Sequence, residues 1–180
     1  FHPDGTVLAT SSLDQTVRIW DVARRTTERV LGPFDSGVNV TAFDPMHPEQ
    51  LLVGLRDGQL VLMNWSTGAE ITRWKEHDGE VLALAYSPRG DCFVSSSADD
   101  SVHVMRTGSH ERLKVLVHDE ARIPAVAFSP DGNWLATGGH DWRVMLWNTS
   151  NWESAHALTG HTQGLYGLQF SEDNRRLLSS

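Results

Sequence analysis

Histidine, aspartate and hydroxyl residues recur along this chain in combinations that could perform two kinds of chemistry. His77, His118 and His161 stand about one repeat length apart, and serines, threonines and aspartates follow them. A histidine between a carboxylate and a hydroxyl is the arrangement of a catalytic triad, and several such side chains together can hold zinc. Catalysis needs one constellation in one cleft, whereas here the combination is repeated at the same phase. We therefore expect these residues to be structural.

Sequence motifs that would support an enzyme are missing from the chain. It contains no Gly-x-Ser-x-Gly elbow, no phosphate-binding loop and no His-Glu-x-x-His pair. The three histidines are too far apart along a repeat architecture to converge on one metal ion. We expect this segment to have no catalytic site, no bound metal and no cofactor.

Five short aromatic-plus-turn stretches set the organisation of the chain. Phe1, Phe43, Tyr86, Phe128 and Phe170 are each followed by turn-forming residues, and their spacings are 42, 43, 42 and 42. A period of roughly 40–45 residues is typical of propellers built from four-stranded blades.

Short alternating segments separated by turn residues fill each repeat. Turn signals arrive about every 8–12 residues, as in all-β folds, and no segment keeps a helical period. The expected strands are 7–10, 17–20, 29–31, 38–43, 51–53, 60–63, 71–74, 81–86, 92–95, 102–105, 113–116, 123–128, 135–139, 143–147, 154–158 and 165–170.

These repeats resemble those of the WD-repeat (WD40) β-propeller family. Trp20-Asp21 is a literal Trp-Asp ending and Trp147-Asn148 is a close variant, whereas Met63 and Met105 stand where the tryptophan is lost. The resemblance implies an all-β propeller of four-stranded antiparallel blades over residues 1–180. The expected repeats are 1–37 (partial), 38–80, 81–122, 123–164 and 165–180 (partial), so we expect the remaining blades of a larger propeller elsewhere in the protein.

The resemblance also implies a buried chain of side chains in each blade, linking a histidine, a hydroxyl, a turn aspartate and the tryptophan. Such a chain stiffens a blade when every member is paired. Only the fourth repeat is complete, and the second has Val53 in place of the hydroxyl. The residues assigned to these chains are His118, Thr137, Asp141 and Trp147, then His77, Ser95 and Asp99, then Thr10, Asp14 and Trp20, and finally Asp57 and His161.

In this family the rim around one mouth of the central channel is the commonest binding face. The resemblance implies two such positions per blade: the residue before the turn aspartate and the second residue of the inner strand. In this chain they are Leu13, Arg56, Ala98 and His140, and Asn39, Leu82, Pro124 and Tyr166. If this face does not bind, Trp65 and Trp152 near the opposite turns are the next candidates.

Charge and cysteine content restrict the partners and the compartment. The chain carries 15 Lys+Arg against 23 Asp+Glu, a net charge of −8, which disfavours nonspecific binding to nucleic acid or anionic membranes. The two adjacent basic pairs, Arg24-Arg25 and Arg175-Arg176, are interpreted as solvated loop or strand-edge residues. No apolar run is long enough to span a bilayer, and the single cysteine, Cys92, fits a reducing compartment. We expect an intracellular, cytoplasmic protein, with the nucleus as the alternative.

The sequence therefore predicts a non-catalytic scaffold that binds protein partners through loops on the rim of a propeller. Two alternatives stay open. One is a regulatory or sensing propeller attached to an ATPase or another enzyme, and the other, less favoured, is a propeller that binds nucleic acid.

Overall fold

The computed structural model describes residues 1–118 and 122–180, and their regular secondary structure is entirely β. The all-β prediction is thereby confirmed. The strands are β1 (Val7–Ser11), β2 (Val17–Asp21), β3 (Thr26–Leu31), β4 (Val38–Phe43), β5 (Gln50–Leu55), β6 (Gln59–Asn64), β7 (Ala69–Lys75), β8 (Val81–Tyr86), β9 (Cys92–Ser97), β10 (Ser101–Arg106), β11 (Arg112–Val117), β12 (Ala125–Phe128), β13 (Trp134–Gly138), β14 (Val144–Asn148), β15 (Glu153–Leu158), β16 (Leu168–Phe170) and β17 (Leu177–Ser179).

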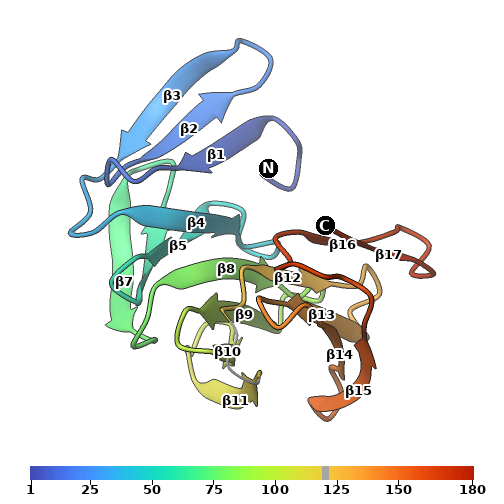
Figure 1. The fold of residues 1–180 in the computed structure, drawn as a ribbon. Coiled ribbons are helices and arrows are strands. Elements are labelled where there is room, and N and C mark those ends of the chain that lie inside the picture. The colour runs from blue at the N-terminus through green and yellow to red at the C-terminus, as the bar shows by residue number, and fades with distance from the viewer. Residues whose placement is uncertain (119–121) are drawn as a thin grey trace. The chain divides into compact units, whose positions relative to one another are not determined.

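The strands form antiparallel meanders in which neighbours in sequence are neighbours in the sheet (Figure 1). The chain divides into two compact units, Phe1–Val81 and Leu82–Ser180. The first unit holds a three-stranded sheet, β1-β2-β3, and a four-stranded sheet, β4-β5-β6-β7. The second holds the sheets of β8 to β11 and of β12 to β15, followed by the β16–β17 hairpin. The four-stranded antiparallel blade predicted from the period is the repeating unit.

Two expected inner strands begin later than predicted. Strand β12 starts at Ala125 rather than 123, since Pro124 has no N–H to donate to a ladder. Strand β16 starts at Leu168 rather than 165. There the N–H groups of Tyr166 and Gly167 both point to the carbonyl oxygen of Ser180, at 2.8 and 3.2 Å, which is not the alternation of a regular antiparallel ladder.

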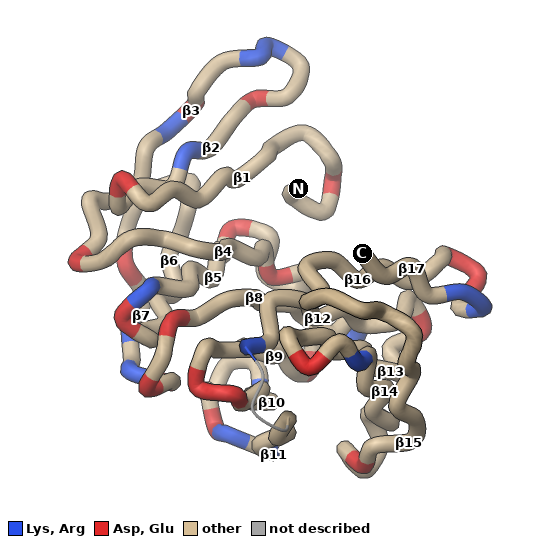
Figure 2. The backbone as a smooth tube through the Cα atoms, in the orientation of Figure 1, with Lys and Arg blue, Asp and Glu red and all other residues tan. Residues whose placement is uncertain are grey.

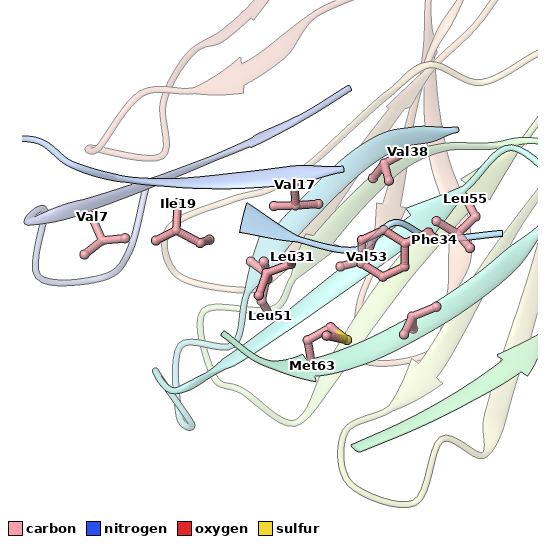
Figure 3. Packing of buried hydrophobic residues seen from close by; sticks show 11 residues of the cluster. Val7, Val17, Ile19, Leu31, Phe34, Val38, Leu51, Val53, Leu55 and Met63 are labelled. Atoms are coloured by element: carbon pink, nitrogen blue, oxygen red, sulfur yellow. The ribbon is translucent and has the colours of Figure 1, made fainter. Parts of the chain in front are cut away.

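Apolar side chains of facing sheets interlock within each unit. In the first unit, Val7, Val17, Ile19 and Leu31 pack against the sheet of β4 to β7, and Ile19 is fully buried (Figure 3). The second unit has two such clusters. One contains Val94, Val104, Ile123, Leu135 and Trp147, and the other contains Ala136, Val144 and Leu165. Within each unit the apolar side chains of one sheet cover those of the next, so these short strands are stabilised by packing between blades.

A small residue follows the hydroxyl position of each repeat and permits close approach to the next inner strand. Ser11 Oγ donates to the carbonyl oxygen of Asn39 at 3.0 Å, and Ser96 Oγ donates to that of Ile123 at 2.6 Å. Glycine takes this position in the other two repeats. A Cβ atom on Gly54 would lie 2.7 Å from Val81 Cγ1, and one on Gly138 would lie 3.2 Å from Leu165 Cδ1. Serine at this position donates a hydrogen bond to the next inner strand, whereas glycine lets the side chains of that strand pack against the backbone.

The turn after each turn aspartate has the same left-handed backbone whatever residue occupies it. The φ angles are 70° at Gln15, 84° at Gly58, 66° at Asp100 and 65° at Trp142. A bulky residue with positive φ is strained, so the tight β-turn, rather than the preference of the residue, sets this conformation.

Candidate interaction surface

The fourth repeat brings its four predicted network residues into one buried chain. Trp147 Nε1 donates to Thr137 Oγ1 at 2.8 Å, and His118 Nε2 lies 2.7 Å from the same oxygen. Since an indole N–H can only donate, Thr137 accepts from Trp147 and its own proton is available to His118 Nε2. Nδ1 of His118 faces Asp141, whose Oδ2 lies 3.6 Å away.

Burial decides what this hydroxyl–histidine–carboxylate series can do. Thr137 is 0% exposed and His118 is 4% exposed, and the ring of His118 lies 6.0 Å from that of Trp147 between centroids. A nucleophile must meet its substrate, and Thr137 Oγ1 is instead engaged by two side chains of its own blade. The arrangement stiffens the blade and offers no reacting group to solvent.

Parts of the same hydrogen-bonded network of side chains occur in the first and fifth repeats. Trp20 Nε1 donates to Thr10 Oγ1 at 2.8 Å, and His161 Nε2 lies 2.7 Å from Ser179 Oγ. The turn aspartates share one contact, in which Oδ1 accepts the backbone N–H two residues later. The donors are Thr16 at 3.0 Å for Asp14, Gln59 at 3.1 Å for Asp57, Ser101 at 3.2 Å for Asp99 and Arg143 at 3.3 Å for Asp141.

The second repeat replaces the polar chain with apolar packing. Val53 is fully buried and Met63 is 5% exposed. Trp65, which sequence reasoning left near a turn, donates its indole N–H to the carbonyl oxygen of Pro48 at 2.8 Å and meets Phe43 edge-on at 6.2 Å. Trp152 meets Phe128 in the same way at 6.5 Å. Both indoles are therefore used in packing within their own units.

The third repeat contains a buried histidine that sequence reasoning missed. His103 is 7% exposed on β10, and its Nε2 lies 3.1 Å from Ser101 Oγ, which in turn donates to Asp99 Oδ1 at 2.6 Å. The signal in the sequence was a single polar residue within an apolar strand. His77 and Ser95, the other predicted members, are buried, at 2% and 0% exposure.

In the first unit, two of the three predicted rim residues are held by neighbours. Arg56 Nη2 lies 2.6 Å from Glu80 Oε1, and this pairing raises the pKa of the guanidinium. Asn39 Nδ2 donates to the carbonyl oxygen of Val81 at 3.0 Å. Leu13 is exposed at 64%. Glu80, which orients Arg56, was not among the predicted site residues.

In the second unit, His140 and Tyr166 meet on the surface. Their rings lie 5.5 Å apart between centroids at an interplanar angle of 65°, and Tyr166 is 69% exposed. The neighbouring Trp142 is 51% exposed. A Cβ atom on Gly164 would lie 2.9 Å from His140 Cδ2, so the backbone packs closely on this ring. The other predicted rim residues of the unit, Leu82, Ala98 and Pro124, are half-buried.

Cys92 is buried, and burial together with the negative charge of Asp91 raises the pKa of its thiol to about 12. At pH 8 only on the order of 1 in 10,000 molecules would carry the reactive thiolate. We expect the folded protein to resist alkylation by iodoacetamide at pH 8, and the urea-unfolded protein to be alkylated rapidly. Mass spectrometry of both samples measures this, and fast labelling of the native protein would contradict it.

A family model described as "WD domain, G-beta repeat" matches residues 1–21, 68–104, 110–148 and 152–180, well over half of the chain. The chain belongs to the WD40 family. The longest unmatched stretch, 22–67, covers most of the second repeat, in which Val53 and Met63 replace the polar chain. The WD40 fold is nevertheless complete there, since β4 to β7 form a full four-stranded sheet.

Several larger WD40-type proteins are similar to this chain. The nuclear distribution protein nudF of Aspergillus niger is 29% identical over 89% of the chain and 37% of its own length. WD repeat-containing protein 1 of Rattus norvegicus is 25% identical over 100% of the chain and 31% of its length. Protein HIR1 of Cryptococcus neoformans is 28% identical over 88% and 21%. The chain thus spans between 21% and 37% of the lengths of these relatives.

In residues 1–118 and 122–180, no group of three or more His, Cys, Asp or Glu side chains could hold a metal ion. Over these ranges there is also no helix with the length and apolarity needed to cross a bilayer.

Proposed function

We propose that this WD40 chain is a non-catalytic scaffold segment that binds a protein partner through exposed turns of its blades. The observation that carries the proposal is the surface pair of His140 and Tyr166 in the second unit. An exposed aromatic side chain that already packs on a second ring loses little further conformational entropy when a partner binds it.

The chemistry of the pair suits protein recognition. Tyrosine is enriched among residues that dominate binding energy, because it joins a large apolar face to a hydrogen-bonding hydroxyl. The backbone N–H of His140 donates to the carbonyl oxygen of Arg122 at 3.0 Å, which fixes the turn that carries the ring. Trp142 adds a second exposed aromatic two residues away.

The first unit offers a separate pair of contacts at the equivalent turns. Leu13 presents an apolar side chain, and the side chain of Arg56 is 46% exposed although Glu80 orients its guanidinium. A surface ion pair of this kind contributes little to stability. Arg56 can therefore be replaced without unfolding the blade, and it remains available to an acidic group on a partner.

The test is a His140→Ala/Tyr166→Ala variant of the full-length protein. We expect its recovery of partner in affinity purification to fall at least about tenfold, since two central aromatic contacts each contribute more than 1 kcal/mol. The triple variant that adds Arg56→Ala is expected to bind more weakly still. The melting temperature should stay within about 2 °C of the parent, because surface substitutions change stability little.

A matched control replaces another exposed histidine and apolar residue of the same unit, His156→Ala/Leu158→Ala on β15. This control should retain the partner. Unchanged recovery with His140→Ala/Tyr166→Ala would reject the proposal and direct attention to the opposite turns.

The alternative is a regulatory segment attached to an ATPase or another enzyme, in which partner binding controls activity elsewhere. It predicts that the same variants change the activity of the attached enzyme. Binding of nucleic acid, the third reading, predicts an affinity that falls steeply as salt rises. We place the protein in the cytoplasm as part of the same proposal.

A further inference from the structure

The β2–β3 hairpin gathers positive charge on an otherwise acidic chain. Residues 17–31 contain Arg18, Arg24, Arg25 and Arg29 against Asp21 and Glu28, whereas the whole chain has a net charge of −8. Figure 2 shows the basic colour at the turn between these strands and again on β3. The side chain of Arg24 is 82% exposed.

A threonine follows the two arginines at the start of the outer strand. Thr27 lies on β3, which pairs with β2 alone in the part of the chain that the structure describes, so one edge of this extended segment is open. Thr27 is exposed and stands opposite Trp20 in the register. Within residues 1–118 and 122–180, no side-chain hydrogen bond engages its hydroxyl. Residues at the same register in the next three sheets, Glu70, Arg112 and Ser154, are exposed as well.

We propose that Thr27 is a phosphorylation site for a serine/threonine kinase that selects arginine two and three residues before its acceptor. Arg24 and Arg25 hold these two positions, and their guanidinium groups match the carboxylates with which such a kinase binds its substrate. ATP supplies the phosphoryl group. The bond from the γ-phosphorus to the bridging oxygen breaks, Thr27 Oγ1 bonds to that phosphorus, the hydroxyl proton passes to the kinase's catalytic base, and ADP leaves.

The other basic pair of the chain shows what distinguishes Thr27. Arg176 stands three residues before Ser179, as Arg106 does before Ser109, but neither serine has a second arginine two residues before it. Ser179 Oγ lies 2.7 Å from His161 Nε2, however, and is part of the chain that links turn and strand in its repeat. A hydroxyl held in such a contact must be released before it can attack, whereas that of Thr27 has no such side-chain partner among the described residues.

Phosphorylation would change the character of the hairpin. A phosphate adds about −1.5 to −2 charges at pH 7, which offsets the excess of two positive charges in residues 17–31. The arginines around it can pair with the new phosphate, so the hairpin would lose its attraction for acidic groups while the fold is retained.

The experiment treats the folded full-length protein with ATP and an arginine-directed serine/threonine kinase and locates phosphate by mass spectrometry of peptides. We expect one phosphate on Thr27, none in Thr27→Ala, and normal labelling in Thr26→Ala and Ser179→Ala. Thr27→Ser should be labelled. Arg24→Ala/Arg25→Ala should lower the initial rate at least about tenfold, because two charge-assisted contacts to the kinase are lost.

A peptide of residues 20–31 serves as the control for the kinase itself. Labelling of the peptide without labelling of the folded protein would overturn the proposal, because the fold would then shield the site. Labelling of neither, or labelling of Thr26 or Ser179 instead, would overturn it too. Labelling of Thr27 with an unchanged near-ultraviolet circular dichroism spectrum would establish it in the folded state.

Discussion

Replacing Gly58 with alanine is expected to lower the free energy of unfolding by about 3 kcal/mol. Gly58 lies in the turn between β5 and β6 with a φ of 84°. A Cβ atom there would lie 2.1 Å from the carbonyl oxygen of His77 and 2.7 Å from that of Gly79. Both obstacles are backbone atoms, and the carbonyl oxygen of Gly58 itself accepts the N–H groups of Glu76 and His77 at 3.1 Å. The turn therefore cannot shift without breaking these hydrogen bonds.

Gly108→Ala provides the matched control. Gly108 has the same φ of 84°, but a Cβ atom there would meet nothing within 4 Å. Alanine at Gly108 thus carries only the cost of the left-handed backbone, about 1 kcal/mol. Urea denaturation of both variants in the full-length protein measures the difference. Equal losses would show that the contact with the 76–79 segment has no effect on stability.

Replacing His118 with alanine is expected to lower the free energy of unfolding by about 1–3 kcal/mol. The substitution removes the ring that lies 2.7 Å from Thr137 Oγ1 and leaves buried polar groups of the chain without their partner. It also empties the volume of the ring next to Trp147. Both changes act in a site that water does not reach, so neither is offset by solvation.

His161→Ala separates the effect of burial from that of the contact. His161 Nε2 lies at the same distance, 2.7 Å, from Ser179 Oγ, but His161 is exposed. Water can replace its hydrogen bond, so we expect a loss below about 1 kcal/mol. Thermal and chemical denaturation of the two variants test the order. A larger loss for His161→Ala would refute the structural reading of the fourth repeat.

The repeat itself predicted the fold class. Turn aspartates such as Asp14, Asp57 and Asp141 recur at one phase, and each binds the N–H two residues later by a contact that depends only on local sequence. The alternation of apolar residues predicted the positions of the strands, because it too depends only on local sequence. The predicted first residues of β12 and β16 were two and three residues too early, because the ends of strands depend on hydrogen bonds to distant backbone groups.

Side-chain partners distant in sequence were the features that sequence reasoning missed. No local sequence pattern indicates that Arg56 pairs with Glu80 or that the indole N–H of Trp65 donates to Pro48. The burial of His103 is likewise not indicated by its immediate neighbours in sequence. The same holds for the surface, where His140 and Tyr166 were proposed separately and the structure places their rings 5.5 Å apart.

The sequence alone was thus enough for the four-stranded repeat and its turns, because the period recurs along the whole chain and turn chemistry acts over a few residues. Tertiary structure decided which hydroxyls are held by another side chain, as Ser179 is, and which are exposed, as Thr27 is. It also decided why Gly58 must remain glycine while Gln15, Asp100 and Trp142 adopt the same left-handed turn with side chains. The reason is physical: hydrogen bonding, burial and steric exclusion depend on the atoms that packing brings close, and many of these are distant in sequence.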